Sequence, residues 1–362
     1  MDFKELASVI EINSHTKNKS GVDQVGQLFS EWMEALGFQT ERHERKEIGD
    51  HLHFRSEQTA GRKLLLLGHL DTVFPINTFT DFHEDQDWIY GPGVCDMKGG
   101  NHVALNALRN THHQQGKINN IDMLLVSDEE TGSDDSKHLT AELASQYDAC
   151  LVFEAAGEKN EVVVARKGVA TMFIELEGKA AHAGNKYTEG CNANLAAAKM
   201  LIALTELTHL KAGTTANVGK MSGGIGANTI SPKASLTIEF RFTCAPERDR
   251  ILAAIKDIAK TTWVDGVSAT LSGGIQRDVM ESTQQQQALL NEIEELLGYS
   301  LPTEKRGGVS DANTASATGT PTLDGFGPFG DGDHTIHERA SKASFEQRIQ
   351  EVTRILSRFN AA

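Results

Sequence analysis

Short apolar runs alternate along the first part of the chain with stretches whose apolar residues repeat at helical spacing. The runs lie at 63–70, 121–127, 148–154 and 161–167, and the helical stretches between them lie near 99–110 and 136–147. Such runs are typical of strands buried on both faces, and their alternation with helices favours a parallel sheet covered on both sides. An amphipathic helix over 21–38, ending near Gly37, precedes them. The pattern therefore predicts an α/β domain with a doubly wound, mostly parallel sheet.

After residue 167 the apolar pattern changes to strict alternation, which is typical of half-exposed strands. Alternating strands are expected at 169–178, 214–221 and 234–242, with helices over about 191–209 and 247–261. This order predicts a small α+β sandwich, an antiparallel sheet plus two helices, inserted into the first domain. The expected boundaries are 1–166 and 277–362 for the first domain and 167–276 for the inserted domain. Helices near 285–298 and 343–359 complete the first domain.

Composition indicates which kinds of partner the protein binds and in which cellular compartment it is expected. Fifty acidic residues against 35 basic residues give a net charge of −15, which argues against nucleic acid or an anionic membrane as a partner. No apolar run approaches the ~18 residues of a membrane span, and the N-terminus is acidic where a secretory leader carries positive charge. The 4 cysteines are widely spaced without a CxxC pair, so we expect reduced thiols in a cytoplasmic protein.

Candidate metal ligands stand where the predicted buried strands end. In GHLDTVF, His69 ends a strand, and Asp71 follows where it can accept the second imidazole proton of His69. In GPGVCDMKGGN, glycines around Asp96 let the backbone approach an ion closely, although a helix N-cap explains the same segment. Each of the two segments alone is also compatible with a structural role.

Further carboxylates and imidazoles follow in three later segments. SDEETGSDD places three acidic residues in succession, including Glu129 and Glu130, which repel each other unless solvent or a cation offsets their charge. Glu154 ends the run ACLVFE, and GPFGDGDHTIHE contains His334 and His337. Imidazole and carboxylate ligands without thiolates suit a catalytic zinc site, and one shared carboxylate would hold two metal ions ~3.5–4 Å apart. Together these segments predict a two-metal hydrolytic centre.

The chain resembles the di-zinc exopeptidase and deacylase family that includes carboxypeptidase G, acetylornithine deacetylase, succinyl-diaminopimelate desuccinylase and aminoacylase. The resemblance rests on GHLDTV, GPGVCDMKGG, DEETGS, RKGVATMFIELEGKAAHAG, GGVSDAN and GDGDHTIHE, which occur in the family's order. It covers nearly the whole chain and is closest to the carboxypeptidase G branch. The resemblance implies a zinc-exopeptidase-like catalytic domain whose inserted domain serves for dimerisation or as a lid.

The resemblance also implies a ligand set for two zinc ions per subunit. His69, Asp96 and Glu154 would bind the first ion. Glu130 and His334 would bind the second ion, with Asp96 bridging the two. Because imidazole and carboxylate ligands also accept Co²⁺ or Mn²⁺, the residues leave the identity of the metal open.

Two acidic residues receive roles beside the metal ligands. Asp71 would orient His69. Glu129 matches the family's general base, which takes a proton from the metal-bridging water and passes it to the leaving amine. A carboxylate beside the metal ions can shuttle this proton without being a ligand itself.

Two positions depart from parts of the family. Glu154 stands where some members have aspartate, and glutamate there goes with carboxypeptidase and deacylase members more than with aminopeptidases. In the closing segment, the family pattern of histidine followed four residues later by glutamate selects His334 with Glu338. His337 is the alternative ligand if that alignment shifts.

In the inserted domain, His182 in GKAAHAG matches a histidine that reaches into the partner subunit's active site and stabilises the tetrahedral oxyanion. The resemblance therefore implies a homodimer formed through the inserted domain. Asn217 and Arg241 resemble positions that bind the substrate's carboxylate, for which a guanidinium is well shaped. Gly307 and Gly308 in GGVSDAN resemble a loop that contacts the substrate backbone. A role as ordinary surface residues is the alternative for His182 and Arg241.

The expected activity is hydrolysis of an amide or peptide bond in an N-acyl or peptidyl amino acid, with a C-terminal glutamate as one candidate. Zinc-activated water would attack, with Glu129 as base. The expected partner is a small molecule or short peptide that bears a carboxylate. One alternative is an aminopeptidase or dipeptidase of the same fold, which needs an acidic residue for the free amine that the sequence does not locate. A non-catalytic metal-binding relative is the other, and the presence of Glu129 argues against it.

Overall fold

The computed structural model describes residues 2–360, and the chain divides into two compact units. Unit 1 comprises Met1–Ala165, Ser282–Arg306 and Ser310–Ala362, and unit 2 comprises Arg166–Glu281 and Gly307–Val309. Unit 2 thus extends a few residues beyond the expected inserted domain, 167–276. It also includes Gly307–Val309 from the GGVSDAN segment. Within residues 2–360, the helices are too short or too polar to cross a membrane.

Unit 1 is built on a sheet with the strand order β1-β2-β6-β3-β7-β14. The strands are β1 (Gln39–His43), β2 (His51–Arg55), β3 (Leu64–His69), β6 (Ile121–Val126), β7 (Ala149–Val152) and β14 (Thr322–Leu323). Strands β6, β3, β7 and β14 run parallel, and the antiparallel hairpin β1–β2 extends the sheet beside β6. The predicted mostly parallel sheet is confirmed. The hairpin went unpredicted because its sequences, QTERH and HLHFR, are too polar for an apolar run.

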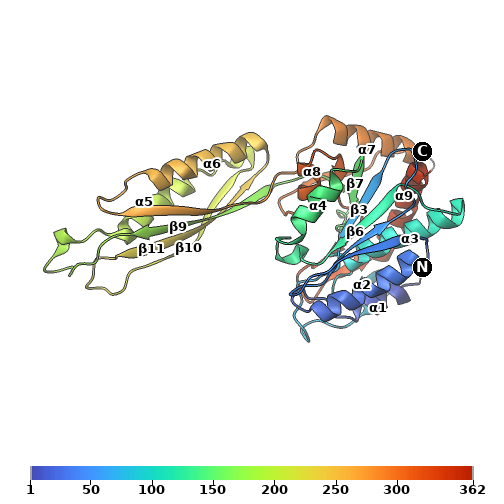
Figure 1. The fold of residues 1–362 in the computed structure, drawn as a ribbon, viewed down its shortest axis with the longest axis horizontal. Helices are drawn as coiled ribbons and strands as arrows, with labels where there is room; N and C mark the ends of the chain where they lie inside the picture. Colours follow the sequence, from blue (N-terminus) through green and yellow to red (C-terminus); the bar gives the residue numbers. More distant parts are fainter. Residues whose placement is uncertain (1, 361–362) are drawn as a thin grey trace. The chain divides into compact units, whose positions relative to one another are not determined.

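Helices cover both faces of this sheet (Figure 1). One core joins α1 (Lys4–Ile10), α2 (Lys19–Glu34), α3 (Lys98–Gln115), α7 (Gln284–Leu297) and α9 (Lys342–Asn360). On β3, Leu64 and Leu66 belong to that core, whereas Leu65 and Leu67 are equally buried but lie outside it. Successive side chains of a strand point to opposite faces, so the second pair faces the side on which α8 (Asp311–Ala317) packs against β3, β7 and α4 (Ser136–Ala144). Burial on both faces explains the unbroken apolar runs.

Two smaller sheets complete unit 1. Strand β8 (Val162–Arg166) pairs with β13 (Thr303–Arg306), so the expectation that the apolar run 161–167 joins the main sheet is wrong. Two of the five residues of β8 are only half buried, as befits a strand in a two-stranded sheet. The other small sheet has the order β15-β16-β5-β4. Its strands are β4 (His83–Glu84), β5 (Trp88–Tyr90), β15 (Gly330–Asp331) and β16 (Arg339–Ser341).

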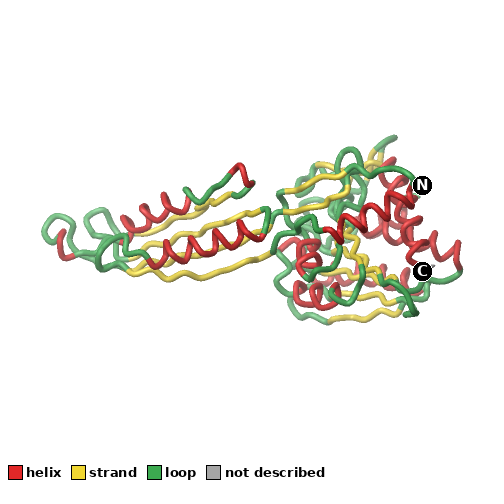
Figure 2. The backbone as a smooth tube through the Cα atoms, turned by 90° about the horizontal axis from the view of Figure 1, so that it is seen from above, coloured by secondary structure: helices red, strands yellow, loops and turns green. Residues whose placement is uncertain are grey.

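Unit 2 is an antiparallel sheet with the order β10-β11-β9-β12, backed by two helices (Figure 2). Its elements are β9 (Gly168–Glu177), α5 (Ala193–Thr205), β10 (Thr215–Gly223), β11 (Lys233–Phe242), α6 (Ala245–Lys260) and β12 (Ser268–Arg277). In β11, every second residue is buried, and α5 and α6 pack against the sheet. The predicted α+β sandwich is confirmed. Strand β12 was missed because glycines and serines interrupt its alternation.

Candidate metal centre

The parallel strands of unit 1 bring candidate ligands to one edge of the sheet. Strand β3 ends at His69, which lies opposite Val126, the last residue of β6. The next turn after β6 is the 3₁₀ helix η1 (Glu129–Thr131), and Glu154 follows the end of β7. Carboxyl ends of neighbouring parallel strands meet at one edge, which is where open α/β sheets bind ligands.

Two loops supply the remaining candidate ligands. Asp96 lies just before α3, and its peptide bond to Met97 is cis. His334 lies between β15 and β16, with a φ of 61° in the left-handed region that non-glycine residues rarely adopt. These loops are far apart in sequence, so the small sheet that joins β16 to β5 is what aligns them.

Glu338 holds the Asp96 loop in place. This buried carboxylate accepts hydrogen bonds from the backbone amides of Gly93 and Cys95, each at 3.0 Å, and from the amide of Asp96 at 3.2 Å. From the sequence, Glu338 served only to select His334, and its role in holding the Asp96 loop was not predicted. The available signal was the glycine-rich turn. Those of its backbone amides that have no partner within the turn need an acceptor when the turn is buried.

The candidate ligands form two clusters that share Asp96. His69 Nε2 lies 3.1 Å from Asp96 Oδ1 and 3.8 Å from Glu154 Oε1. His334 Nε2 lies 3.2 Å from Asp96 Oδ2 and 3.2 Å from Glu130 Oε2. Within each cluster the ligand atoms all lie within 4.8 Å of one another. His337, the alternative to His334, belongs to neither cluster.

The donor set fits divalent metal ions of the zinc type. Tetrahedral zinc with bonds of about 2.0 Å places its donor atoms about 3.3 Å apart, close to the separations seen here. Glu130 Oε1 is buried without a hydrogen-bond partner, as expected of a ligand oxygen that a cation would satisfy. Imidazole and carboxylate donors without thiolate are the set found at catalytic rather than structural zinc sites.

The electrostatics of the clusters also call for a cation. Burial, reinforced by the charge of Asp96, raises the pKa of Glu130 to about 7 and raises that of Glu154 well above its usual range. Burial disfavours the charge of Asp96 as well, but hydrogen bonds from His334 and His69 outweigh it and lower the pKa of Asp96. Hydrogen bonds to Asp96 and Glu130 raise the pKa of His334 to about 11. Protonated imidazoles thus offset the carboxylates, and a divalent cation would displace those protons.

Asp71 contacts residues of both clusters. His69 Nδ1 lies 2.9 Å from the Asp71 carbonyl oxygen and 3.4 Å from its Oδ1, so Nδ1–H points at Asp71. This leaves Nε2, which faces Asp96, as the nitrogen that would offer a lone pair to a metal ion once its proton is displaced. The carboxylate also accepts the backbone amides of Glu129 and Glu130, each at 3.2 Å. The residue expected to orient one histidine is therefore placed to hold the η1 turn as well.

Glu129 lies beside the clusters without belonging to either of them. It is half-buried in η1, next to Glu130 in the sequence. Its negative charge adds to burial and the charge of Asp96 in raising the pKa of Glu154, which His69 lowers. Glu129 thus lies next to a candidate ligand in the sequence but supplies no ligand atom to either cluster.

The remaining predicted residues belong to unit 2, where most of them gather at one end of the sheet. Arg241 donates from Nη1 to the carbonyl of Gly307 at 2.8 Å, and from Nε and Nη2 to the Glu239 carboxylate. Asn217 pairs with Glu239 across β10 and β11, so it shares a face with Arg241. The Gly308 carbonyl accepts a hydrogen bond from Arg166 Nη1 at 3.1 Å.

His182 lies at the opposite end of that sheet. Arg241 pairs with Val169 at the start of β9, whereas His182 follows Glu177, the last residue of β9. The backbone amides of Gly184 and Asn185 donate to His182 Nδ1 at 3.2 and 3.1 Å. Because Nδ1 accepts both bonds, the ring proton belongs on Nε2, which makes Nε2 a hydrogen-bond donor.

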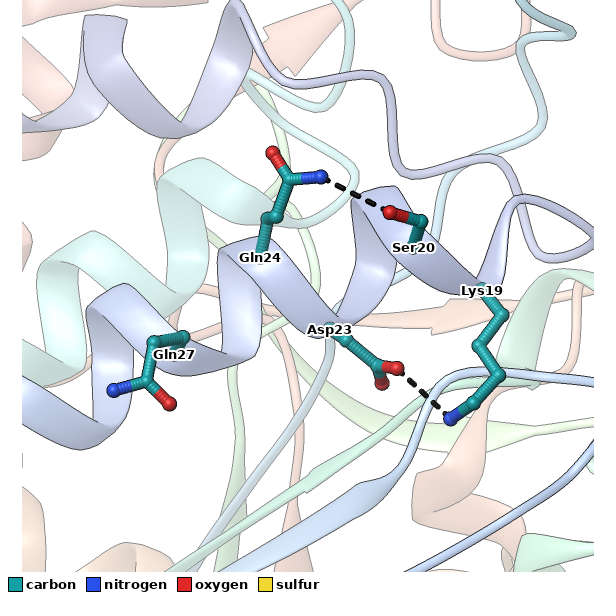
Figure 3. A pocket seen from close by; sticks show the side chains of 5 residues that line it. All are labelled: Lys19, Ser20, Asp23, Gln24 and Gln27. Atoms are coloured by element: carbon teal, nitrogen blue, oxygen red, sulfur yellow. Dashed lines mark hydrogen bonds and ion pairs between the residues drawn. The ribbon is translucent and has the colours of Figure 1, made fainter.

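A shallow hollow of about 570 Å³ on the outer face of α2 lacks this chemistry (Figure 3). Its lining has no histidine, and its two charged groups pair with each other, with Lys19 Nζ 2.8 Å from Asp23 Oδ2. Lys19 also pairs with Asp50, which lies outside the lining, at 2.7 Å. Gln24 donates to Ser20 one turn away. Such pairs along one exposed helix face are ordinary solvated surface.

Comparisons with known proteins match these features to a family. The model of peptidase family M20/M25/M40 matches residues 65–358. Carboxypeptidase G2 of Pseudomonas sp. strain RS-16 is 26% identical over 343 residues, covering 92% of this chain and 83% of that protein. Succinyl-diaminopimelate desuccinylase of Alkalilimnicola ehrlichii is 25% identical over 374 residues, with coverages of 94% and 95%.

Solved structures share the fold. A tripeptidase from Staphylococcus aureus superimposes with a TM-score of 0.81 at 24% identity, covering 98% of both chains. The matched segment, residues 65–358, contains every residue of the two ligand clusters. The chain therefore belongs to peptidase family M20/M25/M40 and is a metal-dependent hydrolase.

Proposed function

We propose that the protein hydrolyses the amide or peptide bond of an N-acyl or peptidyl amino acid at two zinc ions, with Glu129 as general base. The observation that carries this proposal is the pair of ligand clusters that share Asp96, with Glu129 next to the candidate ligand Glu130 in η1. His69, Asp96 and Glu154 would hold one ion, and Asp96, Glu130 and His334 the other. Zinc, when bound, lowers the pKa of water toward ~7 and polarises the substrate's carbonyl group.

The side chains of the protein supply proton transfer and a hydrogen-bond donor. Glu129 accepts a proton from the attacking water and returns it to the leaving nitrogen, a task that suits a carboxylate outside the ligand set. Asp71 holds the η1 turn and the His69 ring in place through its hydrogen bonds. His182, with its proton on Nε2, donates to the oxyanion that develops on the substrate's carbonyl oxygen.

We further propose that the substrate carries a carboxylate recognised by Arg241 and Asn217, near the backbone of Gly307 and Gly308. The Arg241 guanidinium still has donors on Nη1 and Nη2 after its bonds to Glu239 and Gly307, enough for a bidentate carboxylate. The names of the relatives, a carboxypeptidase and a desuccinylase, support such a substrate. A C-terminal glutamate is the candidate we favour.

The dipeptidase alternative requires an acidic residue for a free substrate amine. Glu239 is the acid beside Arg241 and Asn217, but Arg241 Nε donates to its carboxylate at 2.9 Å. A carboxylate already paired with a guanidinium is a weak site for a second cation. This pairing favours substrates with a blocked amine.

A substrate panel tests the proposal. Enzyme stripped with chelator and reloaded with zinc is assayed on N-acetyl amino acids, N-benzoylglutamate, folate and free dipeptides. We expect cleavage of N-blocked acidic substrates that disappears on chelation. Preference for free dipeptides would move the activity to the dipeptidase alternative, and loss of all cleavage in fully loaded enzyme would contradict both.

Replacement of Arg241 by methionine is expected to raise KM about 10–100-fold for carboxylate substrates, since a hydrogen bond to a charged group contributes about 1.5–3 kcal/mol. The same substrates made as primary amides should show a much smaller change. Arg248→Met, which removes a guanidinium paired with Asp249 and Asp278 elsewhere in unit 2, is the matched control. Equal effects on acid and amide substrates would speak against the assignment.

We also propose a homodimer formed through unit 2. His182 and Arg241 lie at opposite ends of one sheet, which supports a site that takes them from different subunits. Helix α5 exposes Leu195 (44%) and Ile202 (60%) on its outer face, as interface helices do.

Subunit complementation tests this arrangement. His182→Ala and Glu129→Gln are each expected to be inactive, but a heterodimer isolated with two affinity tags should recover about half of the wild-type activity, because one of two equivalent sites is intact. Inactive heterodimers would show that each chain completes its own site. A monomer in analytical ultracentrifugation would contradict the dimer itself.

A further inference from the structure

The N-terminal segment of the chain contacts the Asp71 carboxylate of the metal centre. Thr16 is buried, with 2% of its surface exposed, and its hydroxyl donates to Asp71 Oδ2 at 2.6 Å. Next to it, the amide of Thr72 donates to the Ser14 carbonyl at 2.9 Å. Thr16 lies outside every motif that carries the resemblance to the family, and 55 residues separate it from Asp71.

Further hydrogen bonds lock this segment against the loops of the centre. The Asn13 side chain donates to the Phe74 carbonyl at 2.9 Å. Lys98, in the first turn of α3 after Asp96, is fully buried and donates from Nζ to the carbonyls of Val9 and Ile12, each at 2.8 Å. These bonds hold the residues that lead up to Thr16, which limits the freedom of its hydroxyl.

Asp71 needs such a donor. The torsion that rotates an aspartate carboxylate is soft, so its orientation depends on the hydrogen bonds it receives. Here Oδ1 receives the Glu129 amide, and Oδ2 receives the Glu130 amide and the Thr16 hydroxyl. The hydroxyl bond is the shortest of the three, and the amide bonds, at 3.2 Å, are longer than usual.

We propose that Thr16 is a positioning residue of the metal centre. Its hydroxyl sets the rotation of the Asp71 carboxylate, and through it the His69 ring and the η1 turn that carries Glu129 and Glu130. The effect on catalysis rests on the proposed function, whereas the effect on metal binding does not. Partners of metal ligands that lie one step further out typically contribute 10–100-fold to metal affinity or activity.

The test compares three variants in the full chain. Thr16→Val keeps the shape and removes the hydroxyl, and Thr16→Ser keeps the hydroxyl. Thr111→Val makes the same exchange at a buried threonine of α3 whose hydroxyl bonds within its own helix, to Ala107 at 2.9 Å. Affinity for Zn²⁺ is measured by competition with a chromophoric chelator, and the absorption spectrum of the Co²⁺-loaded protein reports ligand geometry.

Thr16→Val is expected to bind Zn²⁺ about 10–100-fold more weakly and to change the Co²⁺ spectrum, while Thr16→Ser and Thr111→Val match the wild type. In the substrate assay the loss should fall on kcat rather than KM, because Thr16 acts through ligands and base. Wild-type Zn²⁺ affinity and spectrum in Thr16→Val would overturn the proposal. So would loss of the fold in Thr16→Val alone, since the hydroxyl would then serve the fold and not the centre. A wild-type protein that hydrolyses nothing would contradict the proposed function and leave the Zn²⁺ comparison valid.

Discussion

Replacement of Glu129 by glutamine is expected to lower kcat about 10²–10⁴-fold while the protein keeps its zinc. The amide has nearly the same shape but cannot accept the proton of the attacking water, and general-base catalysis is worth this range. Glu129 stands outside both ligand clusters, so the metal ions lose no donor. Steady-state kinetics on the best substrate of the panel, beside the zinc-to-protein ratio by plasma emission, measures both quantities.

The neighbouring glutamate provides the control. Glu130→Gln makes the same chemical change one residue away, but Glu130 Oε2 lies 3.2 Å from His334 Nε2 within the second cluster. This variant should therefore lose zinc, and its activity should partly return when the zinc concentration is raised. Equal zinc loss in both variants would mean that Glu129 is itself a ligand, and unchanged kcat in Glu129→Gln would remove it as the base.

Replacement of Asp96 by alanine is expected to empty both metal sites and to abolish hydrolysis. Asp96 Oδ1 faces His69 at 3.1 Å and Oδ2 faces His334 at 3.2 Å, so one substitution removes a donor from each cluster. It also leaves two imidazoles without the partly buried carboxylate between them. After dialysis against metal-free buffer, about two zinc ions per chain should remain in the wild type and about none in the variant.

His334→Ala serves as the matched comparison, because it removes one ligand of one cluster. The other cluster, His69 with Asp96 and Glu154, is more deeply buried than His334, whose side chain is 56% exposed. This variant should keep about one zinc ion per chain. Retention of wild-type zinc by a folded Asp96→Ala protein, checked by circular dichroism, would show that the carboxylate is not shared between two ions.

Elements that follow from local pattern were predictable. The runs 63–70 and 121–127 became β3 and β6 because a strand buried on both faces shows only apolar side chains. Alternation in 234–242 became β11, whose one face is buried against the helices and whose other face is half exposed. The polar hairpin β1–β2 and the glycine-containing β12 lack either signal, because the contacts that hold them come from neighbouring strands.

Candidate ligands were also readable from the sequence wherever a ligand ends a buried strand. His69, Glu130 and Glu154 come from neighbouring parallel strands, and topology alone predicts that they meet. The choice of His334 over His337 depended on family resemblance, since both occupy one irregular loop. Only the three-dimensional arrangement places His334 next to Asp96 and Glu130.

The sequence by itself thus determined the α/β and α+β units and the residue types of the metal centre, because hydrophobic periodicity and strand order act locally. The tertiary structure alone decided which groups hold those ligands: Glu338 reaches the amide of Gly93 across 245 positions, and Thr16 reaches Asp71 across 55. Such bonds leave no periodic trace, because a buried hydrogen bond needs only one donor and one acceptor that the fold brings within about 3 Å.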